Sequence, residues 1–392
     1  YRDEKKMLQV IAAIFIVIFF IPYTASGFAA CGKLFSSLFG VKYLTAMIIS
    51  AIVIVAYTTL GGFLAASTTD FIQSIIMSVA LIVVLIFGVE TAGGIGAVIH
   101  NASELPGYLS MTLSYDVNTG KAAPYSALTI VSTAAWGLGY FGMPHILLRF
   151  MAIEDEKKLK LSRRVATIWV VISLFVAVFI GVIGYTMSKV GALEMLTGSN
   201  SETIIVKISA LLSQHGVIFA LLAGVILAGI LASTMSTSDS QLLAASSAVS
   251  SDILGAFRKD SSNKNGSMAA ARITLLVISV VAAFIARNPD SSVFAIVSFA
   301  WAGFGAAFGP VVLFSLFWKR TNKWGALAGM VCGGSMVFIW KYLIRPLGGI
   351  WNIYELLPAF LIACAAIVIV SLLTPKPSKE IEEEFDRVAQ MK

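Results

Sequence analysis

The sequence alternates between long apolar runs and short polar segments. Most of the runs are close to the ~20 residues that an α-helix needs to cross a bilayer. They lie at 7–34, 43–63, 70–90, 126–148, 165–188, 217–251, 271–287, 292–318, 324–344 and 351–373. The roughly ten-residue alternating segments of a membrane β-barrel do not occur. The pattern therefore predicts an all-α polytopic membrane protein with about ten transmembrane helices.

The run at 126–148 is interrupted where a membrane helix should be continuous. It reads Trp-Gly-Leu-Gly-Tyr-Phe-Gly-Met-Pro-His over 136–145. Glycine and proline weaken a helix, and lipid cannot pair the backbone groups that a break exposes. Such a break is tolerated where it lines a protein cavity, and transporters place solute and ion sites at breaks of this kind. The interruption makes transport the first functional hypothesis.

Three residues at the break are candidates for a solute site. Trp136 and Tyr140 lie one helical turn apart, so we expect their rings to close over a small cavity, although aromatic residues also form belts at membrane surfaces. Pro144 fixes the backbone where the helix resumes, and its missing N–H leaves one carbonyl free to face a ligand. His145 could titrate or bind a metal, but a lone histidine is more often structural.

A second unusual segment carries many hydroxyl groups inside an apolar run. Ser233, Ser236 and Thr237 have the spacing i, i+3 and i+4, which places them on one helical face. Sodium is a hard cation that binds several oxygen ligands, and hydroxyls and carbonyls provide them without burying a charge. The alternative is that small hydroxyl residues let two helices approach closely.

Asp70 stands at the expected start of the span at 70–90, directly after two threonines. At that place a carboxylate either caps the helix N-terminus or has a functional role inside the membrane. The sequence alone leaves both interpretations open.

Composition and charge agree with a membrane protein. Hydrophobic residues make up 58% of the 392 residues and charged ones 12%, about half the charge of an average soluble domain. The net charge of +7 comes from basic residues in alternate loops, at 2–6, 149–164, 258–272, 319–323 and after 375. The positive-inside rule makes these loops cytoplasmic, so both chain ends should face the cytoplasm and no nucleic-acid partner is expected. We expect one transmembrane domain, 1–374, and a charged cytoplasmic tail, 375–392.

The sequence shows no constellation typical of an enzyme. Paired carboxylates, metal-ligand clusters, a nucleophile beside a base and phosphate-binding loops are all missing, so we expect neither catalysis nor a cofactor. Cys31, Cys332 and Cys364 have no paired spacing and should be core thiols. The glycine-rich run 303–310 indicates close helix packing. Outside the spans we expect only loops and two short surface helices, near 203–213 and 380–387, and no obligatory protein partner is evident.

These segments together resemble the sodium:solute symporter family almost end to end. The resemblance is carried by the matches at 57–65 with Asp70, at 136–151, at 232–247 and at 298–310. It implies a core of five plus five helices in an inverted repeat, with extra C-terminal helices. It also implies that inward flow of Na⁺, the coupling ion, drives uptake of a small solute.

The resemblance also implies roles for the residues at the break. Residues 126–148 would be the broken first helix of the second repeat. Trp136, Tyr140 and Pro144 match positions tied to proline recognition in the family, and Tyr23 matches a cavity-facing position. We therefore expect import of proline by alternating access across the inner (plasma) membrane. Another small amino acid or a carboxylate is the alternative solute, and a transporter-like membrane sensor is the alternative class.

Ion-site residues carry over in the same way. Ser236 and Thr237 match the sodium-coordinating hydroxyls, Ser233 matches a position that offers its carbonyl, and Asp70 matches a carboxylate near the cytoplasmic ion exit. The family has about three further helices before the position of Tyr1, and they hold the rest of the sodium shell. The chain is therefore expected to be a fragment that does not transport alone.

Three residues depart from the pattern of proline-transporting members. Met143 stands where those members have a glutamine, and Ala228 and Ser240 also differ. These departures make the identity of the solute less secure than the family.

Overall fold

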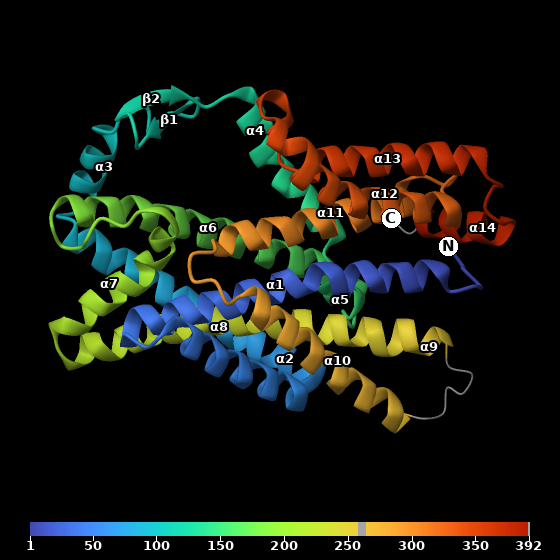
Figure 1. The fold of residues 1–392 in the computed structure, drawn as a ribbon, viewed down its shortest axis with the longest axis horizontal. Helices are drawn as coiled ribbons and strands as arrows, with labels where there is room; N and C mark the ends of the chain where they lie inside the picture. The colour runs from blue at the N-terminus through green and yellow to red at the C-terminus, as the bar shows by residue number, and fades with distance from the viewer. Residues whose placement is uncertain (258–263, 391–392) are drawn as a thin grey trace.

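The computed structural model shows long helices lying side by side (Figure 1). It describes residues 1–257 and 264–390, and the side chains of all of these except 61–66, 257 and 264–267. In the described part, nine helices are long and apolar enough to cross a membrane. Together with the interrupted run at 126–148 they account for the ten predicted spans, so the predicted architecture is confirmed.

The described chain contains fourteen α-helices and one small hairpin. The α-helices are α1 (Met7–Phe39), α2 (Tyr43–Thr91), α3 (Ile95–Ser103), α4 (Ala127–Ala134), α5 (Pro144–Met151), α6 (Leu159–Lys189), α7 (Ile204–Leu212), α8 (Val217–Ser247), α9 (Leu254–Phe257), α10 (Lys264–Ile285), α11 (Val293–Phe317), α12 (Lys323–Ile339), α13 (Leu356–Leu373) and α14 (Lys379–Gln390). The 3₁₀ segments are η1 (Ala135–Gly142), η2 (Glu156–Lys158), η3 (Gly198–Thr203), η4 (Ser213–His215), η7 (Arg345–Leu347) and η8 (Gly349–Trp351), and the π-helical segments are η5 (Ala248–Ile253) and η6 (Trp340–Ile344).

Helix α11 is the most buried of the spans. Residues 299–311 are all buried, and α11 packs against α1, η1, α12 and α13. A helix that is apolar on every side is expected in the interior. By contrast, α6 exposes Val165, Ile168 and Val171, which suits contact with lipid tails.

The glycines of α11 allow this close packing. A Cβ at Gly305 would come within 2.8 Å of the Gly139 Cα, and a Cβ at Gly309 would come within 2.8 Å of the Phe360 ring. Small residues let helices approach closely, so the predicted role of the 303–310 run in packing is confirmed.

The two predicted spans at 43–63 and 70–90 both lie in α2. Its membrane-length segments are Tyr43–Leu60 and Ser67–Thr91. The hydroxyl oxygens of Tyr57 and Thr69 are 2.6 Å apart. At ~1.5 Å per residue a straight helix would hold these two residues ~18 Å apart. The chain therefore turns back between them, as two separate spans require.

The loop at 91–125 contains structure that was not predicted. It forms α3 and a hairpin in which β1 (Leu113–Asp116) pairs antiparallel with β2 (Lys121–Pro124). The Asp116 carboxylate accepts bonds from the Asn118 N–H and the Thr119 hydroxyl, both at 2.9 Å, and Gly120 has φ +67°. These contacts close the turn between the two strands.

The loop at 189–216 is tied to the bundle. The predicted short helix is confirmed as α7, although Val206, Ile208 and Leu212 are buried and the helix does not lie free on the surface. The predicted tail helix is confirmed as α14, which has no buried residue. Part of the basic loop named above at 258–272, residues 258–263, lies outside the described residues. Figure 1 places both chain ends at one end of the bundle and α3 with its hairpin toward the other.

Glu202 fastens this loop to two spans. Its carboxylate pairs with Lys33 of α1 at 2.7 Å and accepts a hydrogen bond from the Ser292 hydroxyl at 2.9 Å, just before α11. Partial burial alone would raise the pKa of Glu202, but Lys33, Ser292 and the N–H groups of Val293 and Phe294 outweigh it and hold the pKa below its usual range. The ends of α1 and α11 are thus joined through one charged residue.

Candidate functional site

The predicted helix break is present. Helix α4 ends at Ala134, a 3₁₀ segment covers Ala135–Gly142, and α5 begins with Pro144 as its first residue. Proline suits a first helical position because its φ is already set and no N–H is lost there. Between them Met143 is extended, with φ −79° and ψ 109°. The segment therefore holds backbone groups that a continuous helix would have paired internally.

Trp301 on α11 packs against this 3₁₀ segment. Its indole Nε1–H donates to the Trp136 carbonyl at 2.9 Å, which pairs one of the freed backbone groups. The ring lies so close to Gly139 that a Cβ there would collide with it. Trp301 lies in one of the matching segments, but no role was predicted for it. The glycine at 139 was the signal that a large side chain approaches the break.

Trp136 and Tyr140 are brought together through Trp301. Trp136 stacks on Trp301 with ring centroids 5.2 Å apart and on Phe294 at 5.5 Å. Tyr140 meets Trp301 edge-on at 4.8 Å and is 47% exposed. The two predicted residues thus contact the same ring, Trp301, and Tyr140 is the more exposed of the two.

Tyr23 approaches the same segment from α1. It is almost completely buried, its ring centroid is 6.1 Å from that of His145, and it lies within electrostatic range of Tyr140. His145 follows Pro144 directly, so Tyr23, Tyr140 and Pro144 surround the end of the 3₁₀ segment. The structure therefore gathers the predicted solute residues around one stretch of irregular backbone.

The three residues that depart from the family pattern, Met143, Ser240 and Ala228, have different surroundings. Met143 is fully buried and belongs to the hydrophobic core around α1 and α11. Ser240 accepts a hydrogen bond from Arg149 at 3.0 Å. Nothing in the structure assigns a role to Ala228. Met143 therefore contributes to packing.

The α8 hydroxyls converge on one carbonyl. Both the Ser236 and the Thr237 hydroxyl donate to the Ser233 carbonyl oxygen, each at 3.1 Å. A hydroxyl that donates this way keeps its lone pairs for a cation. The alternative interpretation was that small residues let α8 pack closely against another helix. This applies at Gly229, one turn before Ser233, where an added Cβ would come within 2.9 Å of the Ala80 Cβ of α2.

Helix α1 links the two groups of residues. Tyr23 faces the break, and Gly27, one turn further along, faces α8, where its added Cβ would be 3.5 Å from Thr234 Cγ2. Thr234 is next to Ser233. A displacement of the hydroxyl residues of α8 can therefore be transmitted to the helix break through a single turn of α1.

Asp70 forms an ion pair with Arg149 of α5, and Arg149 also bonds Ser240. Asp70 lies inside α2, close to the start of its second membrane-length segment at Ser67, so both the capping and the functional interpretation stay open. Nearby, the Tyr57 hydroxyl donates to the Asp239 carboxylate at 3.1 Å, and Asp239 is fully buried. No role was predicted for Tyr57 or Asp239. The Gly-Gly-Phe part of the matching segment, within 61–66, lies outside the described side chains.

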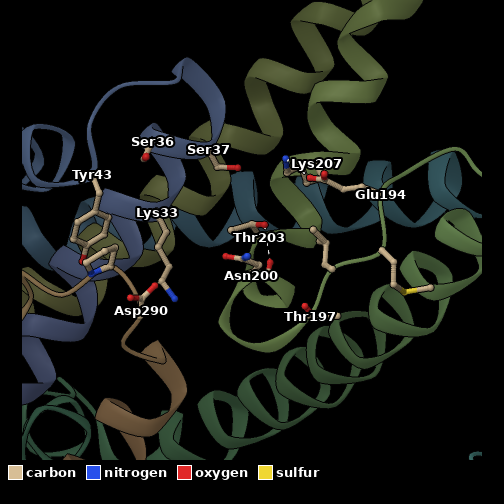
Figure 2. A pocket seen from close by; sticks show the side chains of 13 residues that line it. Lys33, Ser36, Ser37, Tyr43, Glu194, Thr197, Asn200, Thr203, Lys207 and Asp290 are labelled. Atoms are coloured by element: carbon tan, nitrogen blue, oxygen red, sulfur yellow. Dashed lines mark hydrogen bonds and ion pairs between the residues drawn. The ribbon is translucent and has the colours of Figure 1, made fainter. Parts of the chain in front are cut away.

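A polar pocket of about 380 Å³ lies apart from these residues, where α1 meets the 189–216 loop (Figure 2). Lys33, Lys207, Glu194 and Asp290 contribute two charges of each sign to its wall. Figure 2 shows Lys207 and Glu194 pointing toward each other, and their charged atoms are 2.7 Å apart. No candidate residue lines this pocket.

The contact of Trp301 with the break yields a prediction. Trp301→Phe keeps an aromatic ring but removes the N–H, and leaving a buried carbonyl unpaired costs about 1–3 kcal/mol. We expect a lower thermal unfolding midpoint for the purified protein. Trp169→Phe is the matched control, because it removes the indole bond to Ser78 on an exposed face. Equal midpoints for the two variants would contradict the proposed contact.

Comparison with known proteins agrees with this geometry. The model of the family described as "Sodium:solute symporter family" matches residues 1–333. A solved structure of a substrate-bound, outward-open Na⁺-coupled sialic acid symporter superposes with a TM-score of 0.74. The match covers 95% of this chain and 76% of that one at 17% identity, so it shows the fold. Among the described residues, no group of three or more His, Cys, Asp or Glu side chains could hold a metal ion.

Two curated relatives match over nearly the whole chain. The osmoregulated proline transporter OpuE of Bacillus subtilis is 38% identical over 379 residues, which cover 97% of this chain and 73% of the relative. The sodium/proline symporter of Escherichia coli is 37% identical over 386 residues, which cover 98% and 73%. The chain therefore belongs to the sodium:solute symporter family, a family of multi-pass membrane transporters, and not of enzymes, that use Na⁺ as the coupling ion.

Proposed function

We propose that the chain forms the transport core of a symporter that imports proline with Na⁺ by alternating access. Relatives at 37–38% identity that are named as proline transporters support the solute. The observation that carries the proposal is the interruption of the helix by the 3₁₀ segment Ala135–Gly142 and the extended residue Met143, beside Tyr23 and Tyr140. Irregular backbone at this depth is what transporters use to bind small solutes.

Proline has an apolar ring and a charged polar end, and the candidate site offers a partner for each. Tyr140, with its half-exposed ring, and Tyr23 provide aromatic surface for the pyrrolidine ring. Trp136 supports this surface by stacking on Trp301. The freed backbone groups near Pro144 meet the polar end. Since Met143 is buried in the core, its replacement of a glutamine is compatible with proline as the solute.

Sodium would bind at the carbonyl of Ser233 and the hydroxyls of Ser236 and Thr237. These three oxygens already converge, so they form part of the shell that a hard cation needs. Sodium that holds α8 in place also holds Gly27 and Tyr23 of α1. Ordering the solute site in advance lowers the cost of binding proline, which gives positive coupling.

The proposed topology places both chain ends and α14 on the cytoplasmic side of the inner (plasma) membrane. Basic loops at 149–164 and 319–323 support this orientation. Residues 1–374 then form one transmembrane domain and 375–392 a cytoplasmic tail. Asp70, next to the 149–164 loop through Arg149, lies toward the ion exit.

Equilibrium binding of radiolabelled proline to the purified protein tests this proposal. Saturating sodium is expected to raise the affinity for proline by about 5–150-fold, the range of typical coupling energies. Proline should raise the affinity for sodium by the same factor, because coupling is reciprocal. An affinity for proline that does not change with sodium would refute the coupling. Sodium-dependent binding of a different amino acid or carboxylate, without binding of proline, would refute proline as the solute.

Trp136→Ala is expected to weaken proline binding about 10-fold while changing sodium affinity less than about 3-fold. The reason is the loss of the three ring contacts of Trp136, with Trp301, Phe294 and Tyr354, each worth about 0.5–1.5 kcal/mol beyond burial. Trp169→Ala, which loses the indole bond to Ser78 on an exposed face of α6, should change neither affinity. A larger effect on sodium than on proline would remove Trp136 from the solute site.

A further inference from the structure

The segment 340–355, which joins α12 to α13, contacts the first half of the broken helix. The backbone N–H of Tyr354 donates to the Ser132 hydroxyl oxygen on α4 at 3.1 Å. Figure 1 shows the start of α13 beside α4. The Tyr354 hydroxyl donates to the Ser298 carbonyl of α11 at 2.6 Å. One residue of the connecting segment therefore links α4 to α11.

The ring of Tyr354 is also part of the stack around Trp136. Trp136 lies nearly parallel to three rings, at 11° to Phe294, 13° to Trp301 and 15° to Tyr354. Phe294 and Trp301 belong to α11, whereas Tyr354 comes from the segment after α12. The bond from its hydroxyl to Ser298 fixes the Tyr354 ring relative to α11. The plane of Trp136 is thus set by α11 and the connecting segment together.

Glu355, the next residue, carries its charge into the protein interior. Its side chain is only 1% exposed, and its carboxylate is 2.8 Å from Arg345 Nη1 and 3.9 Å from Lys341 Nζ. A buried carboxylate needs such partners, because an unpaired charge is costly to bury. Both cations come from the segment 340–355 itself. Glu355 therefore closes this segment and fixes the residue next to it, Tyr354.

The two cations of this segment are not explained by membrane topology. In the proposed orientation the segment 340–355 is on the outer side, where lysine and arginine are disfavoured. Pairing with Glu355 gives both a structural use. Lys341 also lies over the Phe299 ring of α11, with its nitrogen 4.2 Å from the ring centroid. Leu356, at the start of α13, is 2.7 Å from where a Cβ on Gly305 would lie, so α13 begins in contact with α11.

From these contacts we propose that Tyr354 is a positioning residue of the solute site and that Glu355 holds it in place. Tyr354 acts through Trp136, whose ring it keeps parallel to Trp301. It does not contact the α8 hydroxyls, so its loss changes the apparent affinity for proline and not the requirement for sodium. The proposal rests on the proposed function, because Trp136 belongs to the proposed solute site.

Uptake of radiolabelled proline into proteoliposomes tests the role of Tyr354, with protein produced together with any coding sequence upstream of Tyr1. Tyr354→Leu is expected to raise the half-saturating proline concentration about 5-fold, since a ring contact and a hydrogen bond are lost. The half-saturating sodium concentration, measured at saturating proline, should stay within about 2-fold. Tyr354→Phe keeps the ring and should stay within about 2-fold of the wild type for proline.

Tyr342→Leu is the matched control, because it removes a tyrosine of the same segment that is 60% exposed. It should change neither half-saturating concentration. A residue needed only for folding would lower the amount of active protein, and so the maximal rate, without changing these concentrations. A Tyr354→Leu variant with a lower maximal rate alone, or a Tyr342→Leu variant with an equal rise for proline, would overturn the proposal.

Glu355→Gln tests whether the buried carboxylate acts through Tyr354. It keeps the shape and removes the charge, and we expect about a 3-fold rise for proline, since a paired charge is lost. Combined with Tyr354→Leu it should add nothing, because residues that act through one contact are not additive. A double variant that multiplies the two effects would refute this order of action. Arg345→Gln breaks the same ion pair from a half-exposed position, and serves if Glu355→Gln does not fold.

The wild type separates failure of this proposal from failure of the proposed function. Wild-type protein without sodium-driven proline uptake would refute the proposed function. Wild-type protein that takes up proline, together with a Tyr354→Leu variant of unchanged half-saturating proline concentration, would refute the positioning role alone.

Discussion

Replacing Ser236 and Thr237 together with alanine is expected to raise the half-saturating sodium concentration of transport about 100-fold or more. Each hydroxyl donates to the Ser233 carbonyl and keeps lone pairs for the cation. A hydrogen-bonding contact to a charged group contributes about 1.5–3 kcal/mol, so two such contacts contribute at least about 3 kcal/mol. Since 1.4 kcal/mol is a factor of ten, the sodium requirement should change by two orders of magnitude.

Ser246→Ala is the matched control for this pair. Ser246 is on the same helix, is buried, and donates its hydroxyl to the Leu243 carbonyl at 3.0 Å. It therefore loses the same kind of bond without touching the proposed sodium oxygens. Uptake should be measured against sodium concentration at saturating proline. An unchanged sodium dependence in the double variant, or an equal change in Ser246→Ala, would remove these hydroxyls from the ion site.

Gly142→Ala is expected to abolish most transport, because the end of the 3₁₀ segment lies directly against the α11 backbone. The added Cβ would come within 2.8 Å of the Gly309 nitrogen and 2.9 Å of the Phe304 carbonyl carbon. Backbone atoms of a buried helix cannot move aside like a flexible side chain. Overpacking of this kind costs about 1–3 kcal/mol, and displacing the segment should lower the uptake rate at least about 10-fold.

Gly137→Ala is the matched control for Gly142→Ala. Gly137 belongs to the same 3₁₀ segment, yet a Cβ there would meet no atom within 4 Å. We expect its uptake rate to stay within about 2-fold of the wild type. Both variants should be measured for uptake and for thermal unfolding in detergent. Equal losses in the two variants would show that the segment needs glycine for flexibility, contrary to the close approach described here.

Hydropathy predicted the membrane part of the fold well, because the bilayer fixes the length of every span. The run predicted at 292–318 is α11, Val293–Phe317, and the run at 217–251 contains α8. The hairpin of β1 and β2 was missed. Its strands have four residues each and lie outside the spans, so neither length nor periodicity marked them, and only the turn at Gly120 left a signal.

The break was predictable because glycine and proline act locally. The residues that hold it were not, because their contacts join distant parts of the chain. Trp301 is 165 positions from Trp136, and Asp239 is 182 from Tyr57. Asp70 shows the same limit: two preceding threonines suggested a cap, whereas its partner Arg149 comes from another helix. The roles of Tyr23, Tyr140 and the α8 hydroxyls in binding remain predictions.

Uptake of radiolabelled proline into proteoliposomes tests the central claim most directly. The protein should be produced from the gene together with any coding sequence upstream of Tyr1, and assayed with an inward sodium gradient and without one. We predict accumulation of proline above equilibrium only when the gradient is present. Equal uptake in both conditions, or no uptake of proline while another solute is driven by sodium, would contradict sodium-coupled proline import by this protein.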